Sequence, residues 1–143
     1  MNDMSHYIQP TASMNPDLFL IHIGTNNLRD SELAEKTANE ILELAALVKT
    51  IQNEVVISSI ITRRDDLNEI AQEVNMILYS QCQDHNILYL DNSNIEKYNL
   101  TYRGRFPGLH LNKRWHSLEK DIFQFSFFHH FRVYEIKFPN FTP

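Results

Sequence analysis

Three short apolar runs, separated by segments with a helical pattern, constrain the fold of this chain most. The runs are LFLIHI (residues 18–23), VVISSI (55–60) and ILYL (87–90). Their apolar residues occupy odd and even positions alike, which is typical of strands buried on both faces. Between the runs, residues 31–51 and 67–82 repeat apolar residues at spacings of three to five, as one face of an amphipathic helix requires. This alternation predicts an α/β fold with a parallel sheet and right-handed crossovers.

Polar residues follow the first two runs, at the strand ends where parallel sheets bind ligands. Residues 24–27 (GTNN) follow the first run, and residues 63–66 (RRDD) lie in the loop after the second. We interpret RRDD as a solvated loop whose charges neutralise one another. GTNN ends a buried strand in a turn rich in side-chain amides. Asn26 is therefore either a simple turn residue or a hydrogen-bond donor aimed at a ligand.

Composition excludes several classes of protein. With 143 residues the chain should form one modest core, and its net charge of -5, without a dense Lys/Arg patch, argues against a nucleic-acid partner. No apolar run approaches the roughly 20 residues that span a bilayer, and we find no signal-peptide pattern, so we expect no membrane partner and a cytoplasmic location. The single cysteine, Cys82, cannot form an internal disulfide. The scattered histidines lack the spacing of metal ligands, so we expect neither a metal nor a cofactor.

Two motifs carry a resemblance to a known family. GTNN after a buried strand, and GLHLN (residues 108–112) ahead of the last predicted helix, resemble the SGNH (GDSL-type) hydrolases. VVISSIITRRDDLNEIAQEVNMIL (55–78) and ILYLDNSNI (87–95) add to the likeness. It covers roughly residues 1–124, which would form a partial SGNH hydrolase-type domain, and leaves 125–143 as an unmatched C-terminal tail. The resemblance implies a flavodoxin-like sheet and hydrolysis of esters by Ser, His and Asp.

The same resemblance assigns roles to particular residues. Gly24 and Asn26 match the family's Gly-x-Asn-Asp block, which makes Asn26 the oxyanion-hole donor and places Gly24 in its turn. His110 matches the histidine of the Asp-x-x-His block, the general-base position. Asn27 and Pro107 stand where the family has the aspartates of these two blocks. A proline ring cannot orient an imidazole or stabilise its charged form, so the catalytic acid is missing.

The family's nucleophile block has no match in this sequence. Ser5 and Ser13 lie in polar, proline-flanked surroundings, with no preceding apolar strand and no Gly-Asp-Ser turn, so we assign no nucleophile. The first strands of the family fold are accordingly expected to be missing. Loss of the serine alone costs a Ser-His-Asp enzyme about a million-fold in turnover. We therefore expect an esterase-like domain that is inactive as a hydrolase. The alternatives are a non-catalytic binding or interaction module and a fragmentary gene product. The expected partner is a small ester substrate or ligand.

Missing strands would also leave an open sheet edge. In the family's strand order, 2-1-3-4-5, the strand at residues 18–23 lies beside the first strand. Without that neighbour it becomes an edge that invites pairing with another chain, and we expect self-association or marginal stability. The tail offers an alternative, since FRVYEIKF (131–138) has the composition of a strand and would cover the edge by folding back onto it.

Overall fold

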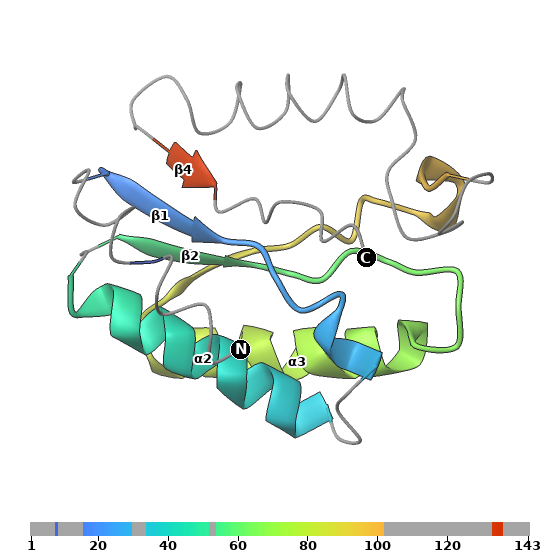
Figure 1. Ribbon diagram of the computed structural model, residues 1–143, viewed down its shortest axis with the longest axis horizontal. Coiled ribbons are helices and arrows are strands. Elements are labelled where there is room, and N and C mark those ends of the chain that lie inside the picture. The colour runs from blue at the N-terminus through green and yellow to red at the C-terminus, as the bar shows by residue number, and fades with distance from the viewer. Residues whose placement is uncertain (1–7, 9–15, 30–33, 52–53, 102–132, 136–143) are drawn as a thin grey trace.

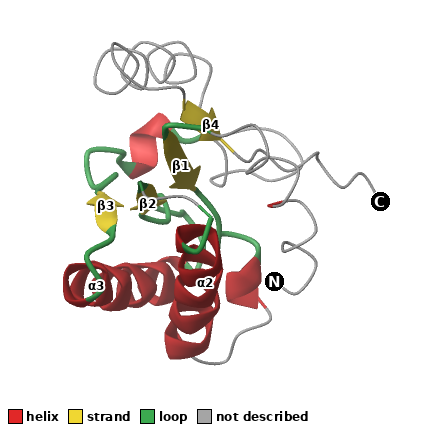
Figure 2. Ribbon diagram, turned by 90° about the vertical axis from the view of Figure 1, so that its left-hand side faces the viewer, coloured by secondary structure: helices red, strands yellow, loops and turns green. Residues whose placement is uncertain are grey.

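The computed structural model places a parallel sheet above two helices that cover one of its faces (Figures 1 and 2). It describes residues 8, 16–29, 34–51, 54–101 and 133–135. Within these ranges strands and helices alternate along the chain as the sequence predicts, and the expected α/β class with a partial flavodoxin-like parallel sheet is confirmed.

The sheet has four strands in the described residues. They are β1 (Leu18–Ile21), β2 (Val55–Ser58), β3 (Leu88–Leu90) and β4 (Val133–Glu135). Their order across the sheet is β3-β2-β1-β4, and every neighbouring pair is parallel. Each of the first three strands falls within a predicted apolar run and is shorter than it: β1 and β2 end two residues before their runs do, and β3 begins one residue after the start of its run. All three carboxyl ends therefore lie at one edge of the sheet, followed by the loops that carry the candidate site.

The crossover helices are α2 (Ala34–Lys49) and α3 (Asn68–Asp84). In α2, Glu35 in the first turn and Lys49 in the last complement the helix dipole. The buried positions of α2 recur every three or four residues, as the predicted apolar face requires: Ala34, Thr37, Ala38, Ile41, Leu44, Ala45 and Val48. In α3 they are Ala71, Val74, Leu78 and Cys82.

Burial on both sides of the strands explains why the apolar runs do not alternate. Phe19 and Ile21 of β1 pack into the main core, which also contains the buried residues of α2 and α3. Leu18 and Leu20 belong to a separate cluster with Val56. Because successive side chains of a strand point to opposite faces, these clusters occupy the two sides of the sheet.

The prediction that β1 forms an open edge of the sheet is wrong for the described structure. β4 pairs with β1 along its length, with Leu18 opposite Val133 and Leu20 opposite Glu135. The strand composition of FRVYEIKF is thus confirmed for Val133–Glu135, a segment of the tail that joins the same sheet as the rest of the chain. Backbone groups that would have recruited another chain are paired within this one.

In the part of the chain that the structure describes, no helix combines the length and apolar character needed to cross a membrane.

Candidate functional site

The GTNN turn directly follows β1 and depends on its glycine. Gly24 has φ +112°, a conformation that L side chains rarely adopt, and a Cβ there would lie 2.8 Å from Ile60 Cδ1 and 3.2 Å from Ile41 Cδ1. The Asn27 N–H donates to the Gly24 carbonyl oxygen at 3.0 Å and closes the turn ahead of the short 3-10 helix η2 (Asn27–Arg29). Asn26, at the tip, is exposed. The backbone is thus fixed from the core side while the amide predicted as the oxyanion donor faces outward.

A buried arginine joins this turn to the loop after β2. Arg63 is 1% exposed, and its Nη1 donates to the Thr25 carbonyl oxygen at 2.8 Å. Its Nε donates to Asp65 Oδ1 at 2.7 Å, and its Nη2 donates to Asp65 Oδ2. This two-point pairing is the strong, directional form of an arginine–carboxylate contact. The hydrogen bond from the Arg63 guanidinium holds the pKa of the Asp65 carboxyl below its ordinary value.

These contacts correct our interpretation of the RRDD segment. Mutual neutralisation is confirmed for Arg63 and Asp65, but the prediction of a solvated loop is wrong for Arg63, which is buried. Burial of this side chain depends on a carbonyl group 38 residues earlier in the chain, so charge pattern alone could not reveal it.

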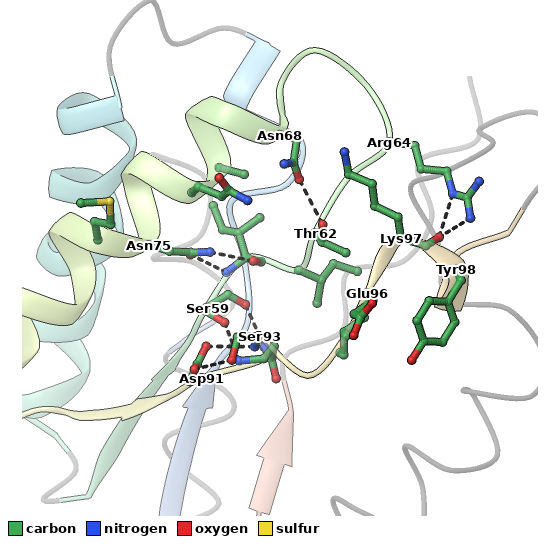
Figure 3. Close-up of a pocket in the computed structure, with 17 residues that line it drawn as sticks. Ser59, Thr62, Arg64, Asn68, Asn75, Asp91, Ser93, Glu96, Lys97 and Tyr98 are labelled. Carbon is green, nitrogen blue, oxygen red and sulfur yellow. Dashed lines mark hydrogen bonds between the residues drawn. The ribbon is translucent and has the colours of Figure 1, made fainter.

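Two asparagines of α3 hold the rest of the loop after β2 (Figure 3). Asn68 Oδ1 accepts hydrogen bonds from the Arg63 backbone N–H at 2.7 Å and from Thr62 Oγ1 at 3.1 Å. Asn75 pairs with both backbone groups of Ile60, accepting from its N–H and donating to its carbonyl, each at 2.8 Å. The loop that carries Arg63 is therefore anchored to α3 at two points.

A polar cluster that the sequence analysis did not predict links the carboxyl ends of three neighbouring strands. Ser58 Oγ lies 2.9 Å from His22 Nδ1 and accepts a hydrogen bond from Asn92 Nδ2 at 2.7 Å. Asn92 also donates to Ser59, from Nδ2 to the carbonyl oxygen at 2.9 Å and from its backbone N–H to Oγ at 2.8 Å. The polar residues within the first two apolar runs, His22, Ser58 and Ser59, were the only signal of this cluster.

Neither Ser58 nor Cys82 is suited to be a nucleophile, although both carry nucleophilic atoms. Ser58 is 2% exposed and is held by the amide of Asn92, so its hydroxyl connects the strands and does not face a ligand. Cys82 is buried, and desolvation raises the pKa of its thiol to about 11, which leaves almost no thiolate at neutral pH.

A groove of about 1080 Å³ lies between α3, the loop after β2 and the loop after β3 (Figure 3). Its rim carries charges of both signs, from Arg64, Lys97, Asp91 and Glu96. Arg64 Nε donates to the Lys97 carbonyl oxygen at 2.8 Å and so connects the two loops that form the groove. The balance of charge favours no strongly ionic ligand. Gly24 and Asn26 do not line this groove.

The loop after β3 is fixed largely by its own side chains. Asp91 accepts from the Ser93 backbone N–H at 2.9 Å and from the Ser93 hydroxyl at 2.6 Å. Farther on, the Glu96 N–H donates to Asn99 Oδ1 at 2.7 Å in a capping box that starts the 3-10 helix η3 (Lys97–Asn99). This wall of the groove therefore has a defined shape without contacts from a ligand.

Of the residues assigned by resemblance, Gly24 and Asn26 lie together in one turn. His110 and Pro107 lie outside the described residues, so the general-base position assigned to His110 stays a prediction. Within the described ranges, no three His, Cys, Asp or Glu side chains gather in a way that would hold a metal ion.

Comparison with protein-family models and with curated proteins finds no match to this chain. The likeness to SGNH hydrolases accordingly rests on the motifs themselves.

Proposed function

We propose that this chain is an SGNH hydrolase-type domain that binds a small ester-like molecule at the carboxyl-end rim of its sheet and hydrolyses it very slowly or not at all. The observation that carries the proposal is the GTNN turn. Its backbone is fixed by the conformation and packing of Gly24, and its Asn26 side chain is exposed at a strand end. This is where a parallel sheet offers its ligand site.

The chemistry available to Asn26 is hydrogen-bond donation to a carbonyl oxygen. A side-chain amide aimed at a developing oxyanion stabilises the transition state of acyl transfer by about 3 kcal/mol. Toward the neutral carbonyl of a bound ester, the same hydrogen bond contributes only about 1 kcal/mol. A donor of this kind supports recognition, but without an assigned nucleophile and with Pro107 in place of the aspartate it does not support efficient turnover.

Titration with ethyl butyrate tests this proposal. NMR should detect a saturable shift of the Asn26 side-chain NH₂ signals in the wild-type chain. Asn26→Asp, which keeps the shape and removes the donors, should weaken binding by about fivefold, the equivalent of a 1 kcal/mol hydrogen bond, as measured by backbone amide shifts because this variant lacks the NH₂ signals, whereas the neighbouring Asn27→Ala should bind as the wild-type chain does. An unchanged affinity in Asn26→Asp, or no binding to the wild-type chain, would contradict the proposal.

A second candidate function is that of a non-catalytic binding module that uses the groove beside α3 and not the GTNN turn. The volume of the groove and its balanced rim charges favour this alternative. Gln72→Trp separates the two, because Gln72 is an exposed residue of the groove lining and a tryptophan there would fill it. An ethyl butyrate affinity that is lowered in Gln72→Trp and unchanged in Asn26→Asp would favour the groove.

A further inference from the structure

The buried guanidinium of Arg63 is the least expected group near the candidate site. An ionised side chain removed from water is costly unless its charge is paired and its N–H groups are bonded. Arg63 meets both conditions through Asp65 and the Thr25 carbonyl, and no buried polar side-chain atom among the described residues lacks a partner. The Arg63 side chain is buried while that of Asp65 is 31% exposed, and an ion pair of this kind adds little net stability. The main physical effect of the Arg63 guanidinium is therefore to fix the orientation of the groups to which it donates hydrogen bonds.

What Arg63 contacts is the peptide group that precedes Asn26. The Thr25 carbonyl belongs to the planar unit that ends at the Asn26 N and Cα atoms. A hydrogen bond at 2.8 Å on that oxygen therefore restricts rotation of the unit from which the Asn26 side chain projects. On the other side, the hydrogen bond from Asn27 to Gly24 closes the turn internally. The turn is thus held once from within and once from the loop after β2.

We propose that Arg63, itself oriented by Asp65, is a positioning residue that sets the direction of the Asn26 amide and couples the loops after β1 and β2. The proposal rests on the function proposed above for Asn26. Arg63 does not touch the ligand. It acts through the backbone of Thr25, while Asn68 and Asn75 hold its own loop against α3.

Arg63→Lys provides the main test, because lysine keeps the charge but cannot reach Thr25 and both Asp65 oxygens with a rigid fork. The readouts are hydrogen exchange of the Asn27 amide, which closes the turn, and the shift of the Asn26 side-chain NH₂. The Phe19 amide, which donates to Glu54 within the sheet at 2.9 Å, reports general stability. We expect Asn27 exchange to accelerate about tenfold relative to Phe19, the equivalent of one lost hydrogen bond from a charged donor. The affinity of Arg63→Lys for ethyl butyrate should be lower than that of the wild-type chain.

Two further variants complete the design. Asp65→Asn, which keeps Arg63 and removes its charge partner, should change Asn27 exchange in the same direction by a smaller factor. Arg64→Lys is the matched control, since Arg64 donates to Lys97 in the loop after β3, and it should leave the turn signals unchanged.

The outcomes separate this proposal from the proposed function. Unchanged Asn26 and Asn27 signals in folded Arg63→Lys, or parallel changes at Asn27 and Phe19, would overturn the positioning role. If Arg63→Lys does not fold, Asp65→Asn decides by the same criteria, and failure of both to fold would show that the pair only stabilises the protein. Absence of ethyl butyrate binding in the wild-type chain would defeat the proposed function, whereas exchange and shifts would still report whether Arg63 sets the turn.

Discussion

Gly24 and Arg63 are fixed in place by different physical effects. Gly24 is required by geometry, since its φ and the approach of Ile60 both exclude a side chain. Arg63 is retained by contacts, because only a guanidinium spans the Thr25 carbonyl and both oxygens of Asp65. The conformation of the turn after β1 therefore depends on close packing against Ile60 and on the charged side chain of Arg63, both from the segment that follows β2.

Gly24→Ala should destabilise the protein through strain. The methyl group would meet Ile60 Cδ1 at 2.8 Å in a backbone conformation unfavourable to alanine, so we expect a loss of about 1–3 kcal/mol in the free energy of unfolding. Urea unfolding measures it. Asn26→Ala, at an exposed position of the same turn, is the control and should change stability by less than about 0.5 kcal/mol. Equal stability of the two variants would show that the turn relaxes around the added methyl group.

Protonation of Asp65 should weaken the protein at low pH. Its pKa is lowered in the folded state by Arg63, from an ordinary value of 3.8. A depressed folded-state pKa gives stability that is fully present above 3.8 and is lost as pH falls through the folded pKa. The urea midpoint of the wild-type chain should therefore drop more steeply than that of Asp65→Asn as the pH is lowered from about 5 to about 3. The control, Asp66→Asn, alters an exposed neighbour and should keep the wild-type slope. Identical slopes in all three proteins would contradict a lowered Asp65 pKa.

At the scale of elements, α3 does more than cover the sheet. Its buried positions pack into the core, while Asn68 and Asn75 hold the loop that follows β2. Asn75 offers one acceptor and one donor to the two backbone groups of Ile60, and so replaces the hydrogen bonds that another strand residue would have made. The chain can therefore leave β2 and turn toward Arg63 without leaving backbone groups unpaired.

Asn75→Ala should accordingly cost about 1–3 kcal/mol of unfolding free energy, because it leaves the partly buried N–H and carbonyl of Ile60 unsatisfied. Chemical denaturation provides the measurement. Gln72→Ala, an exposed position one turn earlier in α3, is the matched control and should be close to neutral. A cost in Asn75→Ala no larger than that in Gln72→Ala would mean that water replaces the amide.

The strands and helices were predictable because burial on both faces and a helical period leave direct traces in the sequence. The GTNN turn was predictable too, since a glycine and two asparagines after a buried strand specify a turn. Arg63 was not predictable, because a charged loop has the same composition whether its arginine is solvated or buried against a distant carbonyl. The link between Ser58, His22 and Asn92 depends on strand register, which composition does not encode.

At the scale of the whole molecule, β4 changes what β1 presents to its surroundings. The described sheet has β3 and β4 at its edges and β1 in its interior. Since Phe19 donates its N–H toward β2, and successive N–H groups of a strand point to opposite sides, the N–H groups of Leu18 and Leu20 point toward β4. Pairing with a segment more than a hundred residues later in the chain thus protects the apolar strand that precedes the candidate site.

Disruption of β4 should expose that strand and change the oligomeric state. Tyr134→Pro removes a backbone N–H opposite Phe19, and proline is poorly tolerated within a paired strand. We expect the wild-type chain to sediment as a monomer at micromolar concentration with a protected Leu20 amide. In Tyr134→Pro, Leu20 should exchange faster, Phe19 should stay protected by β2, and the chain should associate through its newly open edge. Tyr134→Phe, which keeps the backbone donor, should behave as wild type. Rapid Leu20 exchange in the wild-type chain, or an unchanged sedimentation coefficient in a Tyr134→Pro variant whose Leu20 is exposed, would show that β4 does not control association.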